Sequence, residues 1–385
     1  MAKVIKATKV KESFDMNAVF GSVDKLNEDA ELLEDSTLST PSEWIDTGCF
    51  ALNVIMSGSL FGGIPAGRII GFAGPSKCGK TLIINKCIAN AQKNGYFGAI
   101  WDSEIAVDKK SALAVGMDPK RVKYYPVDTI EQCRNQISRL LDNINAMPKA
   151  ERPKIIISID SLGNLASSKE LLDADKDKEA ADVGQRAKAI KSMLRVLTYK
   201  AAKAGVPIIF SNHIYEGMSM FPTLVKDQAG GKGPIYMASI LVQMGLRDEK
   251  SKDNPEEESL AISHHVSGTT LTAFTTKNRF VPSYLKTELY INFTSGLDKY
   301  SGLLDIAIGF DVIQQSGSTY SFQGEKIGYR KNFEKDGNFW EKKVFPVLEA
   351  TLQEKLKYGT GCSSVDLAEE VDKIDEQDDE QETAD

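Results

Sequence analysis

The stretch Arg68-Ile69-Ile70-Gly71-Phe72-Ala73-Gly74-Pro75-Ser76-Lys77-Cys78-Gly79-Lys80-Thr81 decides the fold of this chain of 385 residues. Its first six residues predict a short buried strand, and a helical pattern begins at Thr81. Between them, residues 74–81 match the phosphate-loop pattern G-x-x-x-x-G-K-[ST] at every fixed position. The strand, loop and helix supply the context that this pattern requires, so a chance glycine loop is the weaker interpretation.

The residue types in this loop fit phosphate binding. Gly74 and Gly79 allow a tight turn that brings backbone N–H groups close to phosphate oxygens. The following helix N-terminus adds about half a positive elementary charge. We expect Lys80 to reach the β- and γ-phosphates and Thr81 to give its hydroxyl to Mg²⁺. The predicted nucleotide-binding loop comprises Gly74, Pro75, Ser76, Lys77, Cys78, Gly79, Lys80 and Thr81.

Composition predicts a packed globule without a membrane segment. Hydrophobic residues make up 42% of the chain, yet no apolar run is long enough to span a bilayer and the N-terminus has no apolar signal core. The odd number of scattered cysteines, without metal-ligand spacing, favours free thiols in a reducing cytoplasm. These are Cys49, Cys78, Cys87, Cys133 and Cys362.

The charge of the chain is unevenly distributed. Residues 366–385 carry 11 acids and one base, so the net charge of −7 consists of −10 in this tail and +3 elsewhere. The tail is expected to be disordered, and it serves either solubility or competition with nucleic acid for a basic surface. Four lysines lie within residues 1–12, before a helix expected from Ser13 to about Asp29.

Several buried strands are predicted to end in polar residues. The apolar run from Phe97 precedes Glu104, residues 153–159 precede Asp160, and residues 206–211 precede Asn212 and His213. Strands alternating with helices predict an α/β fold with a mostly parallel central sheet and helices on both faces. Ligands bind at the carboxyl ends of such strands, where these residues and the phosphate loop would meet.

The acids at these strand ends suggest catalytic roles. Asp160 is interpreted as the Walker B acid that holds Mg²⁺, although a helix cap is the alternative. Glu104 is the candidate base for an attacking water, and a cap or surface acid is the more ordinary role for such a residue. His213 is a candidate γ-phosphate sensor or a structural histidine, and Asp108 is a weaker candidate near the base or ribose.

Two later regions suggest nucleic-acid contacts and a neighbouring subunit. On the helix predicted over residues 184–204, Lys188, Lys191 and Arg195 share one face, which is either a phosphate-binding stripe or a solvated surface. The long segment 213–234 suits a loop that orders on nucleic acid. The cations within residues 276–280 form an ordinary turn or act on a phosphate in the next subunit.

In combination these stretches resemble the RecA-type recombinases, closest to the phage branch of UvsX-like strand-exchange proteins. Beyond the phosphate loop, the matching stretches follow the family order across about residues 45–310. They comprise residues 62–68, 101–104, 159–166, 210–213, 230–231, 276–279 and 300–305.

The resemblance implies a DNA-dependent ATPase that uses ATP and Mg²⁺ and forms a helical filament on single-stranded DNA. The filament would pair with homologous double-stranded DNA and exchange strands in recombination, repair and replication. Glu104 would be the catalytic glutamate and His213 the sensor, where the bacterial proteins have glutamine. DNA-binding loops would lie at about 168–184 and 214–233. Lys188, Arg195, Gly230, Gly231 and Lys232 would bind DNA, and Lys277 and Arg279 would reach ATP in the adjacent subunit.

The expected organisation is a RecA-like ATPase and DNA-binding core at residues 41–310. Residues 1–40 would be a helical arm for docking between protomers, 311–362 a C-terminal extension and 363–385 the acidic disordered tail. Implied partners are a single-strand-binding protein and a recombination mediator, in the host cytoplasm if the chain is phage-encoded. A hexameric replicative helicase is the alternative. A non-catalytic loader is disfavoured because Lys80, Thr81, Glu104 and Asp160 are all present.

Overall fold

The computed structural model describes residues 15–33, 36, 38–174, 184–215, 226–246, 268–292 and 296–356. Internal contacts divide the chain into two units, residues 1–40 and residues 41–385. In the first unit, helix α1 spans Met16–Asp24 and exposes Val19, Phe20 and Val23. The helix is shorter than expected, because a turn held by the side chain of Asn27 follows it. The lysine-rich residues 1–12 and the tail from residue 363 lie outside the described residues.

The second unit is built on one large mixed sheet. Six neighbouring strands are parallel, in the order β9-β3-β7-β6-β4-β5, and antiparallel strands β10, β11 and β12 extend the β9 edge. The strands are β3 (Ile69–Gly74), β4 (Phe97–Asp102), β5 (Val122–Pro126), β6 (Ile155–Asp160), β7 (Ile208–Tyr215), β8 (Asp227–Gln228, paired with β7), β9 (Ile240–Leu246), β10 (Gly268–Asn278), β11 (Lys286–Asn292) and β12 (Gly296–Leu297).

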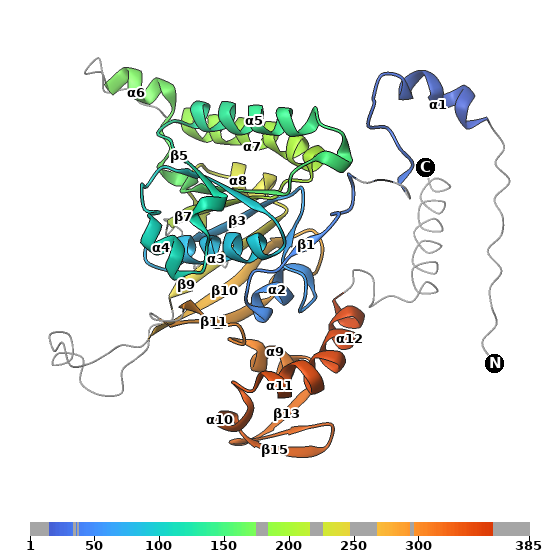
Figure 1. The fold of residues 1–385 in the computed structure, drawn as a ribbon, viewed down its shortest axis with the longest axis vertical. Coiled ribbons are helices and arrows are strands. Elements are labelled where there is room, and N and C mark those ends of the chain that lie inside the picture. The colour runs from blue at the N-terminus through green and yellow to red at the C-terminus, as the bar shows by residue number, and fades with distance from the viewer. Residues whose placement is uncertain are drawn as a thin grey trace, which may run out of the picture. The chain divides into compact units, whose positions relative to one another are not determined.

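Helices cover both faces of the sheet, as the sequence predicted (Figure 1). On one face, α5 (Ile130–Asn145) and α7 (Gln185–Ala204) bury Ile137 and Leu194 against Ile159 and Phe210. On the other face, α3 (Lys80–Lys93) packs with α2 (Phe50–Ser57) in a second core. Thr129 caps α5 by accepting the N–H of Gln132.

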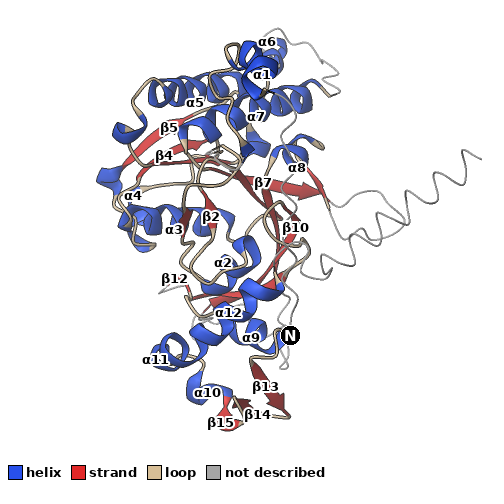
Figure 2. Ribbon diagram, turned by 90° about the vertical axis from the view of Figure 1, so that its right-hand side faces the viewer, coloured by secondary structure: helices blue, strands red, loops and turns tan. Residues whose placement is uncertain are grey.

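Shorter elements surround these layers. Strands β1 (Trp44–Ile45) and β2 (Ile64–Pro65) form a small pair, and α4 (Lys109–Ala114), α6 (Ser168–Ala174) and α8 (Gly233–Met237) follow strand ends. The C-terminal region contains α9 (Leu303–Gly309), strands β13 (Ile313–Ser316), β14 (Thr319–Phe322) and β15 (Glu325–Tyr329), α10 (Arg330–Phe333), α11 (Gly337–Phe339) and α12 (Phe345–Lys355). Figure 2 shows β13, β14 and β15 beside α10. None of the helices in the described part is both long and apolar enough to cross a membrane.

The register of the parallel strands positions the site. Gly74 at the end of β3 is paired with His213 of β7, and Asp102 at the end of β4 is paired with Asp160 of β6. The carboxyl ends of four strands therefore lie at one edge of the sheet, where ligands of open α/β sheets bind.

Candidate active site

The phosphate loop joins β3 to α3 and depends on its two glycines. Gly79 is the N-cap of α3 with φ of 72°, and a Cβ there would lie 2.9 Å from Cδ1 of Ile291. A Cβ on Gly74 would lie 2.8 Å from the carbonyl oxygen of Met244. Neither position therefore has room for a side chain, and Gly79 also needs a conformation that glycine adopts at low cost. The loop thus leads directly into a helix N-terminus, which favours anions.

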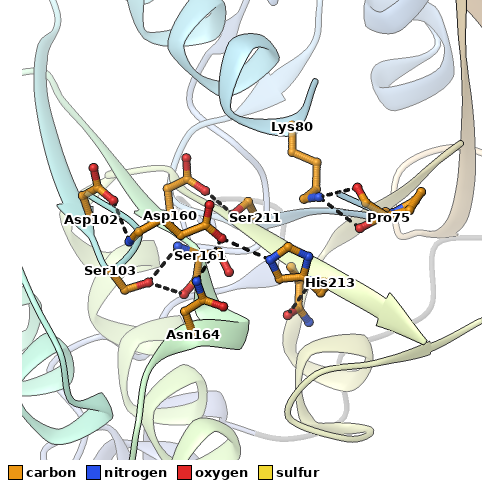
Figure 3. Close-up of polar contacts among 12 residues, drawn as sticks. Pro75, Lys80, Asp102, Ser103, Asp160, Ser161, Asn164, Ser211 and His213 are labelled. Carbon is orange, nitrogen blue, oxygen red and sulfur yellow. Dashed lines mark hydrogen bonds and ion pairs between the residues drawn. The ribbon is translucent and has the colours of Figure 1, made fainter. Parts of the chain in front are cut away.

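Lys80 is folded onto the loop from which it projects. Its Nζ donates to the carbonyl oxygens of Gly74 at 3.0 Å and Pro75 at 2.8 Å (Figure 3). The side chain is buried, and Cys78 lies beneath it with a pKa raised by burial. Because carbonyl oxygens carry no net charge, a phosphate group would compete effectively for this ammonium.

Asp160 is a buried carboxylate held by two hydroxyl groups. Ser211 of β7 and Thr81 of α3 both donate to it. Burial raises the pKa of Asp160, these hydrogen bonds partly offset that effect, and the charges of Glu104 and Asp102 raise the pKa further. A divalent cation at this carboxylate would relieve the repulsion, and Mg²⁺ prefers such oxygen ligands.

Glu104 lies in a short loop that is organised by Asp102. The Asp102 carboxylate is fully buried and accepts four backbone N–H groups, at distances from 2.8 to 3.1 Å. The donors are Glu104, Ile105, Ala106 and Val107. The loop therefore wraps around one carboxylate and presents the Glu104 side chain in a fixed direction.

Two side chains meet Glu104. Its Oε1 accepts a hydrogen bond from Nδ2 of Asn164 at 3.1 Å, and Nε2 of His213 lies 3.1 Å from the same oxygen (Figure 3). The strand ends beneath are tied together by Ser103, whose hydroxyl donates to the carbonyl of Ser161 and accepts the N–H of that residue.

Most of the nucleotide candidates share one cavity of about 460 Å³. It has the size of a ligand pocket and brings the phosphate loop, the candidate base, the magnesium candidates and the sensor candidate together. Its lining comprises Ser76, Lys77, Gly79, Lys80, Thr81, Leu82, Asn85, Glu104, Ser111, Ala114, Val115, Asp160 and His213. The sequence placed most of these residues at strand ends or in the loop, and the structure brings those residues together.

Besides Gly74, Pro75 and Cys78 of the phosphate loop itself, three further nucleotide-site candidates lie outside this lining. Asp108 caps α4, where its carboxylate accepts the N–H of Ser111. Lys277, near the end of β10, donates from Nζ to the carbonyls of Ile235 at 2.9 Å and Tyr236 at 2.7 Å. Arg279 is exposed. Burial, together with the charge of Arg279, lowers the pKa of Lys277 to about 8.

The DNA candidates lie beside one another on a different part of the unit. Lys188, Lys191 and Arg195 are exposed on α7, as the spacing predicted. A Cβ on Gly230 would lie 2.7 Å from Ile190, and one on Gly233 would lie 3.0 Å from Cβ of Lys191. The glycine-rich segment that contains Gly231 and Lys232 therefore packs along the basic helix. Residues 175–183 and 216–225, within the two expected loops, lie outside the described residues.

Sequence reasoning did not assign roles to Asp102, Asn164 or Ser211. Asp102 is the first polar residue after the apolar run of β4, as Asp160 is after that of β6, so the pattern that identified Asp160 also pointed to Asp102. The contacts of Asn164 and Ser211 join residues that are 60 and 51 positions apart, which local patterns do not reveal.

Comparisons with known proteins agree with this geometry. The RecA N-terminal domain family matches residues 17–298. A recombination and repair protein of Enterobacteria phage T4 is 34% identical over 272 residues, which cover 69% of this chain and 64% of the phage protein. RecA of Clostridioides difficile is 30% identical over 316 residues, or 82% of each chain. RecA of Nocardia farcinica is 28% identical over 349 residues, or 91% of each chain.

The role of Asp102 can be tested with Asp102→Asn. Asparagine has one acceptor oxygen in place of two, so one pair of part-buried N–H donors loses its partner. We expect the free energy of unfolding to fall by about 2 kcal/mol. Nucleotide hydrolysis should fall about 10- to 100-fold as Glu104 loses its position.

Urea unfolding and steady-state hydrolysis provide the two measurements. Asp118→Asn is the matched control, because Asp118 caps a short helical turn at the surface through the N–H of Lys120. Wild-type turnover in Asp102→Asn would contradict the assigned role.

Proposed function

The chain belongs to the RecA family, and from that premise we propose that it is an ATP-dependent DNA recombinase. It forms filaments on single-stranded DNA, pairs that strand with homologous duplex DNA and exchanges strands. The observation that carries this proposal is the single cavity that collects the phosphate loop, Asp160, Glu104 and His213. The relatives carry RecA or recombination names, and none of the three comparisons above favours a helicase.

The residues of the cavity fit a magnesium nucleotide. Thr81 and Asp160 already touch and would hold Mg²⁺, which keeps most of its ligands as water and phosphate oxygens. When bound, the metal ion neutralises charge that develops between the β- and γ-phosphates. Lys80 exchanges its two carbonyl partners for phosphate oxygens, and the helix N-terminus at Gly79 supports the same charge.

Glu104 acts as the general base for hydrolysis. It accepts a proton from the water that attacks the terminal phosphate, while His213 stands beside it at the end of β7. The carbonyl of His213 accepts the N–H of Ala229, and the side chain of Asn212 donates to the carbonyl of Ala229. The sensor end of β7 is therefore tied to the glycine-rich segment that begins at Gly230, which supports coupling between nucleotide and DNA.

The site is completed by a neighbouring protomer. Lys277 and Arg279 do not line their own cavity, and the carbonyl partners of Lys277 leave its charge available to an anion. We assign both residues to ATP in the adjacent subunit, with residues 1–40 docking between protomers. Asp108 is retained as a contact to base or ribose, because its neighbour Ser111 lines the cavity. A single-strand-binding protein and a mediator are the expected partners, in the host cytoplasm if the chain is phage-encoded.

A strand-exchange assay tests the function directly. Purified protein with ATP, Mg²⁺, circular single strands and homologous linear duplex should give joint molecules, whereas heterologous duplex should give none. Electron microscopy of the same mixture should show open filaments. Closed hexamers that unwind forked DNA without pairing homologous strands would support the helicase instead.

Mixing two inactive variants tests the contact between subunits. Glu104→Gln lacks the base but offers Lys277, and Lys277→Ala keeps the base but lacks the cation. Each alone should hydrolyse ATP at least 100-fold more slowly than wild type. In an equal mixture about one quarter of the interfaces contain both Glu104 and Lys277. The reason is that a head-to-tail contact takes one of these residues from each protomer.

DNA-dependent ATPase activity is the readout for this mixture. The control mixes Glu104→Gln with the double variant Glu104→Gln/Lys277→Ala, which supplies no base and should give no recovery. If the first mixture also fails to recover, Lys277 does not act across the interface.

Filament assembly should depend on the protonation of Lys277. Its lowered pKa of about 8 means that the free protomer loses this charge as pH rises through 8, so ATP-dependent assembly should slow above that pH. Lys277→Arg should assemble without this alkaline limb, because a guanidinium stays charged. Light scattering measures the assembly of both proteins between pH 6.5 and 9.5. Identical pH profiles of assembly would contradict the role of the ammonium charge.

A further inference from the structure

One buried asparagine in the wall of the nucleotide cavity is left without a partner. Asn85 of α3 is only 3% exposed, and it lines the cavity. Within the part of the chain that the structure describes, its side-chain amide makes no hydrogen bond. Buried polar groups in folded proteins are nearly always paired, because an unpaired one loses its water without compensation. The amide of Asn85 therefore calls for a partner that the folded chain does not supply.

Packing alone does not explain an asparagine at this position. Its neighbours Ile83, Ile84 and Ile88 on α3 are buried apolar residues, so a leucine at position 85 would suit the same helix. The other comparably buried asparagine of α3 is Asn90, whose Oδ1 accepts a hydrogen bond from Nζ of Lys93 at 2.7 Å. Only the asparagine that lines the cavity lacks such a contact in the described residues.

Asn85 lies in the part of the cavity that is formed by two helices. Leu82 and Asn85 line it from α3, and their spacing of three residues places them on one face of that helix. Ser111 and Ala114 line it from α4, and Val115 caps the end of α4. Figure 1 shows α4 beside α3. The walls in this region are mostly aliphatic, unlike the charged region around the phosphate loop.

The hydroxyl of Ser111 is already used within α4. It accepts the N–H of Asp108 at 3.0 Å and donates to the carbonyl of the same residue at 2.9 Å. The amide of Asn85 is therefore the available hydrogen-bonding group in the aliphatic region. With the triphosphate on Lys80 and Thr81, this region is left for the base, since ligand pockets combine apolar walls with a few placed polar groups.

The chemistry of a carboxamide selects among the bases. Its N–H donor and its carbonyl acceptor lie side by side, so asparagine pairs with adenine through two hydrogen bonds. Adenine offers the matching amino donor next to a ring-nitrogen acceptor. Guanine offers two acceptors at the corresponding edge, and one of them would face the carbonyl oxygen of the amide.

We propose that Asn85 is a specificity-determining residue that recognises the adenine base of the bound nucleotide. This inference rests on the proposed function and deepens it. Oδ1 of Asn85 accepts a hydrogen bond from the amino group of adenine, and Nδ2 donates to the adjacent ring nitrogen. The base thereby supplies the partner that the buried amide lacks, and a base without the amino group leaves Oδ1 unpaired.

The test compares two diphosphates that differ only in the amino group, ADP and purine riboside 5′-diphosphate. Their affinities for the full chain are measured with Mg²⁺ and without DNA, by displacement of a fluorescent ADP analogue. Wild type should bind ADP about tenfold more tightly than the second diphosphate or GDP, because each of these leaves the buried acceptor unpaired. Asn85→Ala and Asn85→Leu should bind ADP and purine riboside 5′-diphosphate equally well, because neither variant has an acceptor for the amino group.

Asn90→Ala is the matched control, because Asn90 is a buried asparagine on the same helix outside the cavity lining. It should keep the tenfold preference of wild type for ADP, whatever its effect on stability. The Asn85→Leu variant keeps the size of the side chain, so it separates loss of the hydrogen bonds from loss of packing. Thermal unfolding midpoints show whether each variant is folded.

The outcomes separate this inference from the proposed function. Wild-type protein that binds neither diphosphate would overturn the proposed function itself. If wild type binds both equally well, or if both Asn85 variants keep the wild-type preference, Asn85 does not recognise the amino group. Equal weakening of both diphosphates in the Asn85 variants would assign Asn85 to the support of the cavity, which also overturns the proposal.

Discussion

Two carboxylates stand opposite each other in the register of β4 and β6, and the site depends on how each charge is compensated. Neighbouring strands lie about 4.8 Å apart, so Asp102 and Asp160 repel each other unless both charges are neutralised. Asp102 is satisfied by four backbone N–H groups, which also shape the loop of Glu104. Asp160 has only hydroxyl donors and keeps a raised pKa. Under the proposed function, the Mg²⁺ of a bound nucleotide would supply the missing positive charge and complete an electrostatic balance that folding leaves open.

The two lysines with proposed phosphate roles are held by the same kind of hydrogen bond. Lys80 and Lys277 each donate to a pair of backbone carbonyls. A carboxylate partner would have to be separated from the ammonium before a phosphate could bind, at a considerable cost in a buried site. A neutral carbonyl oxygen is replaced by a charged phosphate oxygen more easily. The carbonyls that hold Lys277 belong to α8, which directly follows the glycine-rich segment.

The sequence predicted the central sheet because apolar runs, glycines and capping residues are local signals. The roles of Gly79, Thr129 and Asp160 can each be recognised from the residues next to them in the sequence. The sequence singled out Glu104 and gave no role to Asp102, since both acids follow one apolar run and only the folded loop shows that Asp102 is the buried one. The cap at Asp108 is local, because Asp108 and Ser111 are three residues apart, whereas the carbonyl pair around Lys277 joins segments 42 and 41 positions apart. Contacts of this kind depend on the register of the strands, which periodicity does not give.

The arrangement around Glu104 explains how distant segments can act on one chemical step without touching the nucleotide. Asn164 and His213 arrive from neighbouring strands and leave toward different segments, yet they converge on one oxygen. Both side chains therefore help to orient the same carboxylate.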